Sequence, residues 1–254
     1  MSADVWFLDT AVACAFYGMI AGMLVPALIA RIPEPEPDTR DDAPTDEAGA
    51  VDGETDQEVR EPKVAYADIA RTKWLRQKTA LATSLVAALV GARIGWDPAL
   101  YLFLFLAPVG VALAVVDWRT RLLPTKVIAP SYVAVIVLAL FAAWSEGDWS
   151  SLFTAGWGWL VSGGLFFVLW LVHPRGMGLG DVRLAGVLGI ALGYLGWAEL
   201  LTGVYAGFLL GGVGGLLLAA LRIVDRRALP FGPFMLVGAL VGVLAGPAVA
   251  AWYV

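Results

Sequence analysis

Residues 98–117 read PALYLFLFLAPVGVALAVVD, and no charged side chain interrupts the stretch before its last residue, Asp117. An α-helix rises about 1.5 Å per residue, so about 20 mostly apolar residues are needed to cross the hydrocarbon core of a bilayer. The stretch therefore predicts one membrane-spanning helix that ends at a carboxylate.

The rest of the chain repeats this pattern of uncharged runs between short charged segments. Of its 254 residues 59% are hydrophobic and 15% charged, with a mean hydropathy of +0.76, whereas soluble domains are roughly half apolar and a quarter charged. This composition excludes a soluble globule, a collagen, a coiled coil and global disorder. We predict an all-α, polytopic integral membrane bundle of about eight transmembrane helices, lying between Asp9 and Arg31 and at residues 79–96, 98–116, 127–145, 150–172, 182–198, 200–221 and 232–253.

The second and sixth of these spans depart from the pattern. The stretch between Lys78 and Arg93 is too short to cross the bilayer alone, so we expect Arg93 to reach outward to an interface marked by Trp96. The sixth span begins at Asp181 and Arg183, and its first turn is therefore expected near a polar surface.

The basic residues predict the orientation of the spans. Of the 17 Lys and Arg residues, 8 lie in the first segment between spans, and the following segments hold 1, 3, 0, 2, 0 and 3. The odd segments thus hold 16 of the 17, and the positive-inside rule predicts that they are cytosolic, with both termini outside. The first residues lack the basic start of a cleavable signal peptide, so we expect residues 1–30 to be a transmembrane helix of the mature protein.

The acidic residues gather in one long segment. Residues 34–61 hold 12 Asp and Glu against Arg40 and Arg60, with few apolar side chains. We predict that residues 31–77 form an acidic, disordered cytosolic loop with a basic juxtamembrane end, residues 64–78 forming a surface helix, and that residues 78–254 form a seven-helix membrane core. The acidic segment is either a solvated linker or a region that attracts a basic substrate.

Small residues recur every four positions in several predicted spans, which predicts close helix packing in a compact bundle rather than a wide pore. They are Gly18 and Gly22; Ala185, Gly189 and Gly193; Gly203, Gly207, Gly211 and Gly215; and Gly238, Gly242 and Gly246. A homodimer formed through such a ridge is left open.

The cysteine count and the charge distribution limit the chemistry. Cys14 is the one cysteine, which excludes an intramolecular disulfide and a cysteine-based zinc site. We predict no metal and no nucleic-acid partner. The formal net charge of -5 is itself a misleading guide to such a partner, because most of the acidic residues lie in one segment.

Two aspartates lie at the predicted cytosolic border: Asp117 closes the third span and Asp181 opens the sixth. A carboxylate at a helix C-terminus meets the negative end of the helix dipole, and one at an N-terminus meets the positive end, so we expect Asp181 to ionise more easily than Asp117. A carboxyl pair that shares one proton is what an aspartyl protease needs, one member activating water and the other donating a proton. The same positions suit helix caps or ion pairs with Arg119 and Arg183, and the residues alone leave this alternative open.

The sequence around both aspartates resembles the type IV prepilin peptidases, a GxGD-type membrane aspartyl protease family. GLGD at 178–181, followed by Val-Arg-Leu, is similar to the GxGD motif. Asp117, followed by Leu123 and Pro124, resembles the first catalytic aspartate with its downstream Leu-Pro element. LPFGPF at 229–234 resembles the late Pro-Phe-Gly-Pro element, and GMIAGMLVPALIARIPEP at 18–35 resembles the first span and its Arg-x-Pro exit.

The resemblance implies an aspartyl endopeptidase of the bacterial inner membrane, with its active site at the cytosolic face. Its partners would be the lipid bilayer and type IV prepilins or pilin-like proteins of pilus or type II secretion systems, from which it removes a short basic leader. The resemblance makes Asp117 and Asp181 the catalytic pair. The residues that it implies in shaping the site or binding substrate are Gly178, Gly180, Arg183, Pro124, Pro230 and Gly232.

The chain departs from the family pattern in its first span and loop. It lacks the two Cys-x-x-Cys pairs of many members, and Met23, Leu24, Val25 and Pro26 replace the usual Ser-Phe-Leu-Asn. We therefore expect no N-methyltransferase activity and no cofactor, since only that activity would require S-adenosylmethionine. Arg183 replaces the commoner lysine and Thr125 the commoner asparagine, which we expect to tune the site.

Other functions are weighed against this one. A small proton-coupled transporter or a non-enzymatic membrane scaffold would use the aspartates as a proton relay or as helix caps. A relay needs carboxylates near the bilayer midplane, whereas Asp117 and Asp181 are predicted at the cytosolic edge of the bilayer. A presenilin-like protease shares GxGD but pairs it with Tyr-Asp, whereas Val116 precedes Asp117 here. An inactive relative is disfavoured because both aspartates are present.

Overall fold

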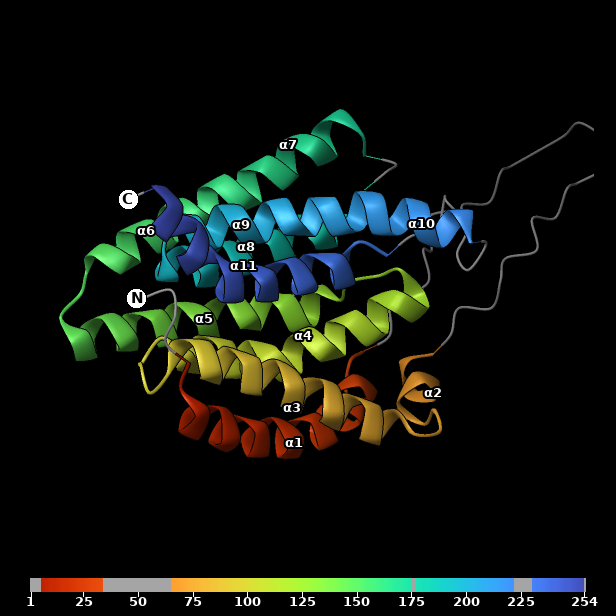
Figure 1. The fold of residues 1–254 in the computed structure, drawn as a ribbon. Coiled ribbons are helices and arrows are strands. Elements are labelled where there is room, and N and C mark those ends of the chain that lie inside the picture. Colours follow the sequence, from red (N-terminus) through yellow and green to blue (C-terminus); the bar gives the residue numbers. More distant parts are fainter. Residues whose placement is uncertain (1–5, 34–64, 175–176, 222–229, 254) are drawn as a thin grey trace, which may run out of the picture.

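The computed structural model describes residues 6–33, 65–174, 177–221 and 230–253. Every regular element in these ranges is a helix (Figure 1). The elements are α1 (Leu8–Ala30), α2 (Tyr66–Ala70), α3 (Leu75–Ile94), α4 (Leu100–Thr120), α5 (Thr125–Glu146), α6 (Ser150–Gly158), the π-helix η2 (Trp159–Gly163), α7 (Gly164–Val172), α8 (Leu179–Leu195), α9 (Trp197–Leu209), the π-helix η3 (Leu210–Gly214), α10 (Gly215–Ala220) and α11 (Gly232–Tyr253). The prediction of an all-α, polytopic membrane fold is confirmed.

The long helices coincide with the predicted spans. Helices α6, η2 and α7 follow one another without interruption, as do α9, η3 and α10. Among the described residues, six segments are long and apolar enough to cross a membrane, namely α1, α4, α5, α6 to α7, α9 with η3, and α11. The other two predicted spans correspond to α3, which carries three basic residues, and α8, which has 17 residues. For these two, a crossing of the membrane stays a prediction.

Both ends of the chain lie at the same end of the bundle (Figure 1). Helix α2, the connection from α4 to α5 and the end of α10 lie at the opposite end. This placement agrees with an even number of crossings, and which end faces the cytosol stays a prediction.

Helix α8 is the most enclosed element. Every residue from Leu184 to Tyr194 is buried, and α8 packs against α5, α6, α7, α9 and α11. The helix that begins at the GLGD motif is therefore held from several sides.

Glycines allow the closest helix pairs, as their spacing predicts. A Cβ atom on Gly22 of α1 would lie 2.5 Å from the carbonyl oxygen of Thr79 in α3. A Cβ atom on Gly193 of α8 would lie 2.7 Å from the carbonyl oxygen of Thr154 in α6. Gly238 and Gly242 of α11 face the backbone of α9 in the same way. The predicted ridges thus form contacts between neighbouring helices of one chain.

Gly22→Ala is expected to destabilise the fold, because the added methyl group would meet backbone atoms of α3 that cannot rotate away. The cost of such overpacking is about 1–3 kcal/mol, measurable as a lower melting temperature in detergent. Gly164→Ala is the matched control, since nothing lies within 4 Å of its Cβ position. Equal melting temperatures for the two variants would contradict the close contact.

Two local predictions are wrong. Arg93 does not reach outward, because it is 1% exposed and interacts electrostatically with buried Glu199 of α9. A carboxylate far away in the sequence accounts for this burial, since a buried charge is tolerated when it is paired.

The basic stretch 64–78 is not one helix either: α2 is separated from α3, and Trp74 has a left-handed backbone with φ of 65°. Most of the predicted acidic loop, residues 34–64, lies outside the described residues.

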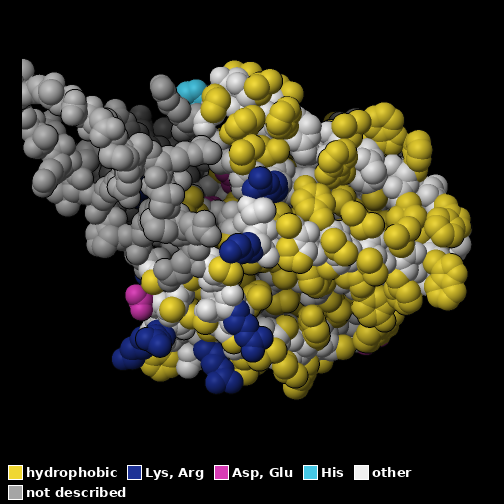
Figure 2. Space-filling model, turned by 180° about the vertical axis from the view of Figure 1, so that it is seen from behind, with side chains coloured by type: hydrophobic (Ala, Val, Ile, Leu, Met, Phe, Trp, Pro, Cys, Tyr) yellow, Lys and Arg dark blue, Asp and Glu magenta, His cyan; other side chains and the backbone are white. Residues whose placement is uncertain are grey.

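The surface is that of a protein embedded in lipid. Large apolar side chains are exposed along α1 and α5, among them Phe16 at 73% and Val133 at 65%. Figure 2 shows an extended apolar face, with Lys and Arg gathered toward one end of it. Exposed apolar area of this extent needs a lipid environment, as expected for a multi-pass membrane protein.

Candidate active site

The two predicted catalytic residues come from opposite ends of two helices. Asp117 lies in the last turn of α4 and is 4% exposed. Its Oδ2 atom accepts a hydrogen bond of 2.9 Å from the backbone N–H of Gly232, the first residue of α11. The end of α4 is thereby joined to the beginning of α11, 115 positions later in the chain.

Asp181 lies in the first turn of α8 and is half-buried. Its Oδ2 atom accepts a hydrogen bond of 3.2 Å from the backbone N–H of Gly178. Burial, and then repulsion by the Asp117 carboxylate, raise the pKa of Asp181 from 3.8 to about 7, while the Gly178 N–H lowers it. The two aspartates therefore lie within electrostatic reach of each other.

The expectation that Asp181 ionises more easily than Asp117 is not supported, because the pKa of Asp181 is raised rather than lowered. It rested on the positive end of the α8 dipole, whose effect is limited to the first turn and is modest in size. Burial penalises the charged carboxylate more strongly, and a second carboxylate nearby adds to the penalty. The prediction that the pair shares one proton is compatible with a pKa of about 7 for Asp181.

Two glycines of the GLGD motif have different surroundings. A Cβ atom on Gly180 would lie 2.6 Å from the Cβ atom of Leu123, so α8 can approach the α4–α5 connection only with glycine there. A Cβ atom on Gly178 would meet no atom closer than 3.5 Å. Gly180 therefore provides a close approach, whereas Gly178 provides a backbone N–H.

Leu123 touches both sides of the site. Besides Gly180 it packs against Gly232, whose Cβ position lies 3.4 Å from Leu123 Cδ1 and 2.7 Å from Asp117 Oδ2. Any side chain at position 232 would thus displace the Asp117 carboxylate. The Leu-Pro element fixes the separation between the beginnings of α8 and α11.

A second group of contacts ties the beginning of α8 to α5. The guanidinium group of Arg183 donates a hydrogen bond to the Thr125 hydroxyl group, and the Tyr132 hydroxyl donates one of 2.8 Å to the Arg183 carbonyl. Pro124 caps α5, and its carbonyl accepts bonds from the two N–H groups of Val127 and Ile128. In the described part of the chain, Arg183 is thus bonded to Thr125 rather than paired with Asp181.

The structure brings together most of the residues that the sequence singled out. Gly178, Gly180 and Gly232 contact the aspartates or Leu123, and Arg183 and Pro124 lie at the adjoining helix ends. Pro230 is buried beside them, and its role stays a prediction. Sequence reasoning missed Tyr132, although its position seven residues after Thr125 places both on one face of α5.

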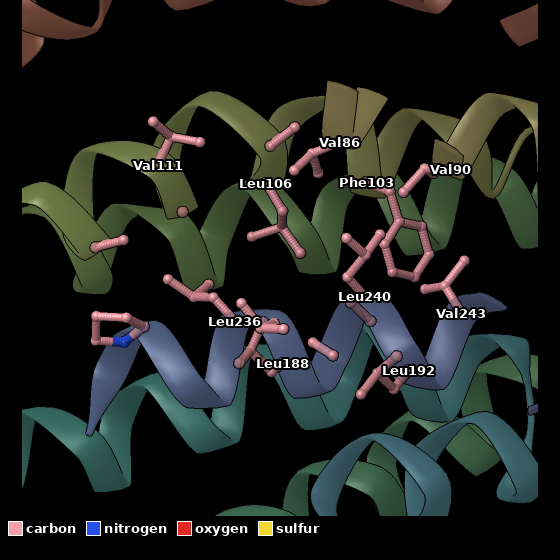
Figure 3. A pocket seen from close by; sticks show the side chains of 17 residues that line it. Val86, Val90, Phe103, Leu106, Val111, Leu188, Leu192, Leu236, Leu240 and Val243 are labelled. Atoms are coloured by element: carbon pink, nitrogen blue, oxygen red, sulfur yellow. The ribbon is translucent and has the colours of Figure 1, made fainter. Parts of the chain in front are cut away.

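An apolar cavity of about 200 Å³ lies inside the bundle, and the last residue of α4 that lines it is Ala114, three positions before Asp117. It lies between α3 and α4 on one side and α8 and α11 on the other (Figure 3). Gly110 and Ala114 of α4 line it on the turns before Asp117, and Pro233 of α11 lines it after Gly232. Leu240 and Phe103 point toward each other across it (Figure 3). Since its lining has no ionisable side chain, this space offers no proton path away from the aspartates.

No metal centre is formed by the described residues, in which no three His, Cys, Asp or Glu side chains gather closely enough to hold an ion. The prediction that the site needs no metal is not tested by this observation.

Comparison with known proteins agrees with the motifs. Residues 104–216, which include both aspartates, match the type IV leader peptidase family. The match covers less than half of the 254 residues. The resemblance seen in the motifs is thereby confirmed.

Several curated proteins that are similar to this chain are bacterial proteins described as prepilin leader peptidase/N-methyltransferase. That of Aeromonas salmonicida is 29% identical over 178 residues, which are 68% of this chain and 59% of the relative. That of Pseudomonas aeruginosa is 27% identical over 175 residues, again 68% and 59%. That of Escherichia coli is 31% identical over 147 residues, 55% of this chain and 60% of the relative. The match thus spans about three fifths of these relatives, and no solved structure matches the chain significantly.

Gly180→Ala is expected to reduce leader cleavage, the activity that the resemblance implies, much more than Gly178→Ala. The added methyl group at position 180 would push α8, and Asp181 with it, away from Leu123. A displacement of about 1 Å can cost roughly 100-fold in rate, whereas position 178 has room for the same group. Rates of leader cleavage by the two purified variants test this, and equal losses would contradict the assigned contact.

Proposed function

We propose that the chain is a prepilin leader peptidase that cleaves peptide bonds with Asp117 and Asp181 as its catalytic pair. One observation carries the proposal: two carboxylates from helices distant in sequence lie close enough to repel each other, and each has its Oδ2 atom held by a glycine N–H. Two neighbouring carboxyl groups at a helix-end junction suit aspartyl protease chemistry better than packing alone.

Each aspartate has a distinct part in the reaction. Ionised Asp117 takes a proton from a water molecule, whose oxygen forms a bond to the carbonyl carbon of the scissile peptide. Protonated Asp181 donates its proton to the carbonyl oxygen. When the tetrahedral intermediate collapses, the C–N bond breaks and the leaving nitrogen takes up the proton held by Asp117, while one hydroxyl of the intermediate returns its proton to Asp181 as the carbonyl bond reforms. The raised pKa of Asp181 supports its part as the acid.

The proposed substrates are type IV prepilins or pilin-like proteins with a short basic leader. The names of the relatives support this class, since they are described as prepilin leader peptidases. The apolar surface supports a substrate that is itself anchored in the bilayer.

The proposed location is the bacterial inner membrane, with the aspartates at the cytosolic face. The beginning of α5 and the ends of α4 and α10 lie together opposite the chain ends, and Arg119, Arg121 and Lys126 flank Asp117 there. Positive charge favours the cytosolic side, where a basic leader would remain.

Methyl transfer is proposed to be absent, with S-adenosylmethionine unnecessary. The relatives' names include N-methyltransferase, but this chain has neither the cysteine pairs nor the Ser-Phe-Leu-Asn segment of such members. This protein is therefore proposed to cleave the leader peptide without methylating the new N-terminus.

Mass spectrometry of a co-expressed prepilin tests both points. With the wild-type enzyme the leader is expected to be lost and the new N-terminus to carry no methyl group. With Asp117→Asn or Asp181→Asn the leader should remain. With Asp148→Asn, a control at a partly exposed carboxylate between α5 and α6, the leader should be lost. Cleavage by either correctly folded dyad variant would contradict the catalytic pair and favour a transporter or scaffold, and an added methyl group would contradict the proposed loss of methyl transfer.

A further inference from the structure

The hydrogen bond from Gly232 to Asp117 depends on how α11 begins. The carbonyl of Phe231 accepts the first helical bonds, from the N–H groups of Phe234 and Met235 at 3.1 and 3.2 Å. The Gly232 N–H belongs to the first turn, where N–H groups have no partner inside the helix, and Pro233 has no N–H at all. Gly232 thus directs an unused helix donor at Asp117, and Phe231 determines where the helix starts.

Phe231 is held by two other phenyl rings. Its ring centroid lies 5.8 Å from that of Phe166 in α7 and 5.8 Å from that of Phe208 in α9. Phe166 and Phe208 are stacked on each other at 4.9 Å, and Phe166 is 3% exposed. We refer to Phe166, Phe208 and Phe231 as the phenyl cluster. Pairs of rings at these separations stabilise by about 0.5–1.5 kcal/mol beyond burial.

The two π-helical turns shape this cluster. Gly211 lies in η3, and a Cβ atom on it would meet the Phe231 ring, 3.0 Å from Cδ2 and closer still to Cε2. The turn η2 ends at Gly163, shortly before Phe166. A π turn adds one residue to a helix and therefore rotates the following side chains by about 100° relative to the preceding helix. The turn η2 thus sets the direction of the Phe166 ring, whereas η3 follows Phe208 and contributes Gly211, which leaves room for the Phe231 ring.

We propose that Phe231 is a positioning residue, which the phenyl cluster and Gly211 hold so that the Gly232 N–H stays on Asp117 Oδ2. This inference rests on the proposed function, in which Asp117 activates water. The ring of Phe231 does not touch the reacting atoms. It acts through Gly232, the neighbouring residue, and thereby fixes which oxygen of Asp117 is left to face water.

A comparison of Phe231→Leu with Phe234→Leu tests this inference. Phe234 lies one turn later on the same helix, and its Cε1 atom is 3.3 Å from the Cβ position of Gly214. Phe234→Leu is therefore the same substitution outside the phenyl cluster. Phe231→Leu is expected to lower kcat by at least about 10-fold with KM within about 2-fold, because orientation of the base is lost while the substrate still binds. Phe231→Tyr should restore most of kcat, and Phe234→Leu should retain it.

Hydrogen exchange of the Gly232 amide gives a readout that needs no activity. Its exchange should accelerate at least 10-fold in Phe231→Leu and stay unchanged in Phe234→Leu, with melting temperatures measured for both. Gly211→Ala, which presses on the same ring, should give the same acceleration if Phe231→Leu does not fold. Equal exchange in the Phe231 and Phe234 variants, or a loss of kcat that follows the melting temperature in both, would overturn the positioning role.

The outcomes separate this inference from the proposed function. If the wild-type enzyme cleaves no prepilin but the exchange results hold, the proposed function fails and the structural part of the inference stands. If Asp117→Asn abolishes cleavage but Phe231→Leu changes neither kcat nor exchange, only the positioning role fails.

Discussion

Asp117→Asn and Asp181→Asn are each expected to lower the kcat of leader cleavage by at least about 1,000-fold, and the double variant should lose little more. General acid and general base catalysis each contribute about 10²- to 10⁴-fold, and residues that act as one unit show strongly non-additive losses. The two carboxylates lie close enough to repel each other, and in the proposed mechanism each performs one of two coupled proton transfers, so the removal of either should disable the pair.

Steady-state rates of the two single variants and the double variant, measured on one purified prepilin, decide this point. Asp148→Asn is the control, because Asp148 is a partly exposed carboxylate between α5 and α6 whose oxygens accept hydrogen bonds from Ser150 and Ser151. Losses that multiply in the double variant would show that the aspartates act independently, and the shared-proton mechanism would then be wrong.

Asp181→Asn is expected to be more stable than the wild type at neutral pH, although it is inactive. The pKa of Asp181 is raised from 3.8 to about 7 in the fold, so the folded state binds its proton more tightly than the unfolded state does. The contribution of Asp181 to the free energy of unfolding is therefore fully present below about pH 4 and is lost as the pH rises to about 7. Asparagine stays neutral throughout, and at 1.36 kcal/mol per pKa unit the difference reaches roughly 4 kcal/mol at most.

The measurement is the melting temperature of both proteins in detergent between pH 5 and pH 8. The advantage of Asp181→Asn should grow over this range and then level off. Asp148→Asn should show no such growth, because hydrogen bonds from Ser150 and Ser151 lower the pKa of Asp148 and keep it ionised over the whole range. A constant difference for Asp181→Asn would contradict the burial of its charge beside Asp117.

The sequence predicted helix positions well because a membrane span requires a long uncharged run, and such runs are visible residue by residue. The same requirement predicted α3 and α8 less clearly, because charged residues lie within both helices. Arg93 at the end of α3 looked like an interfacial residue, yet it is buried near Glu199. Pairing between helices depends on residues distant in the chain, and one sequence contains no direct signal for it.

The sequence predicted which residues form the candidate site, but not the hydrogen bonds that join them. The GLGD and Leu-Pro elements pointed to Asp181 and Asp117, whereas nothing in the residues indicated that Gly232 donates to Asp117. The helix dipole argument failed for Asp181 because burial, which depends on the packed neighbours, outweighs it. The phenyl cluster was missed as well, since phenylalanines in apolar helices carry no distinctive spacing.

The bond between α4 and α11 also bears on the order of events during biosynthesis. Asp117 emerges from the ribosome long before Gly232, which begins the last of the described helices. A nascent chain that has inserted α1 to α10 therefore holds both aspartates but lacks the donor that orients one of them. Proteolytic competence should accordingly arise only when α11 enters the bundle, so that partly synthesised chains are harmless to neighbouring membrane proteins.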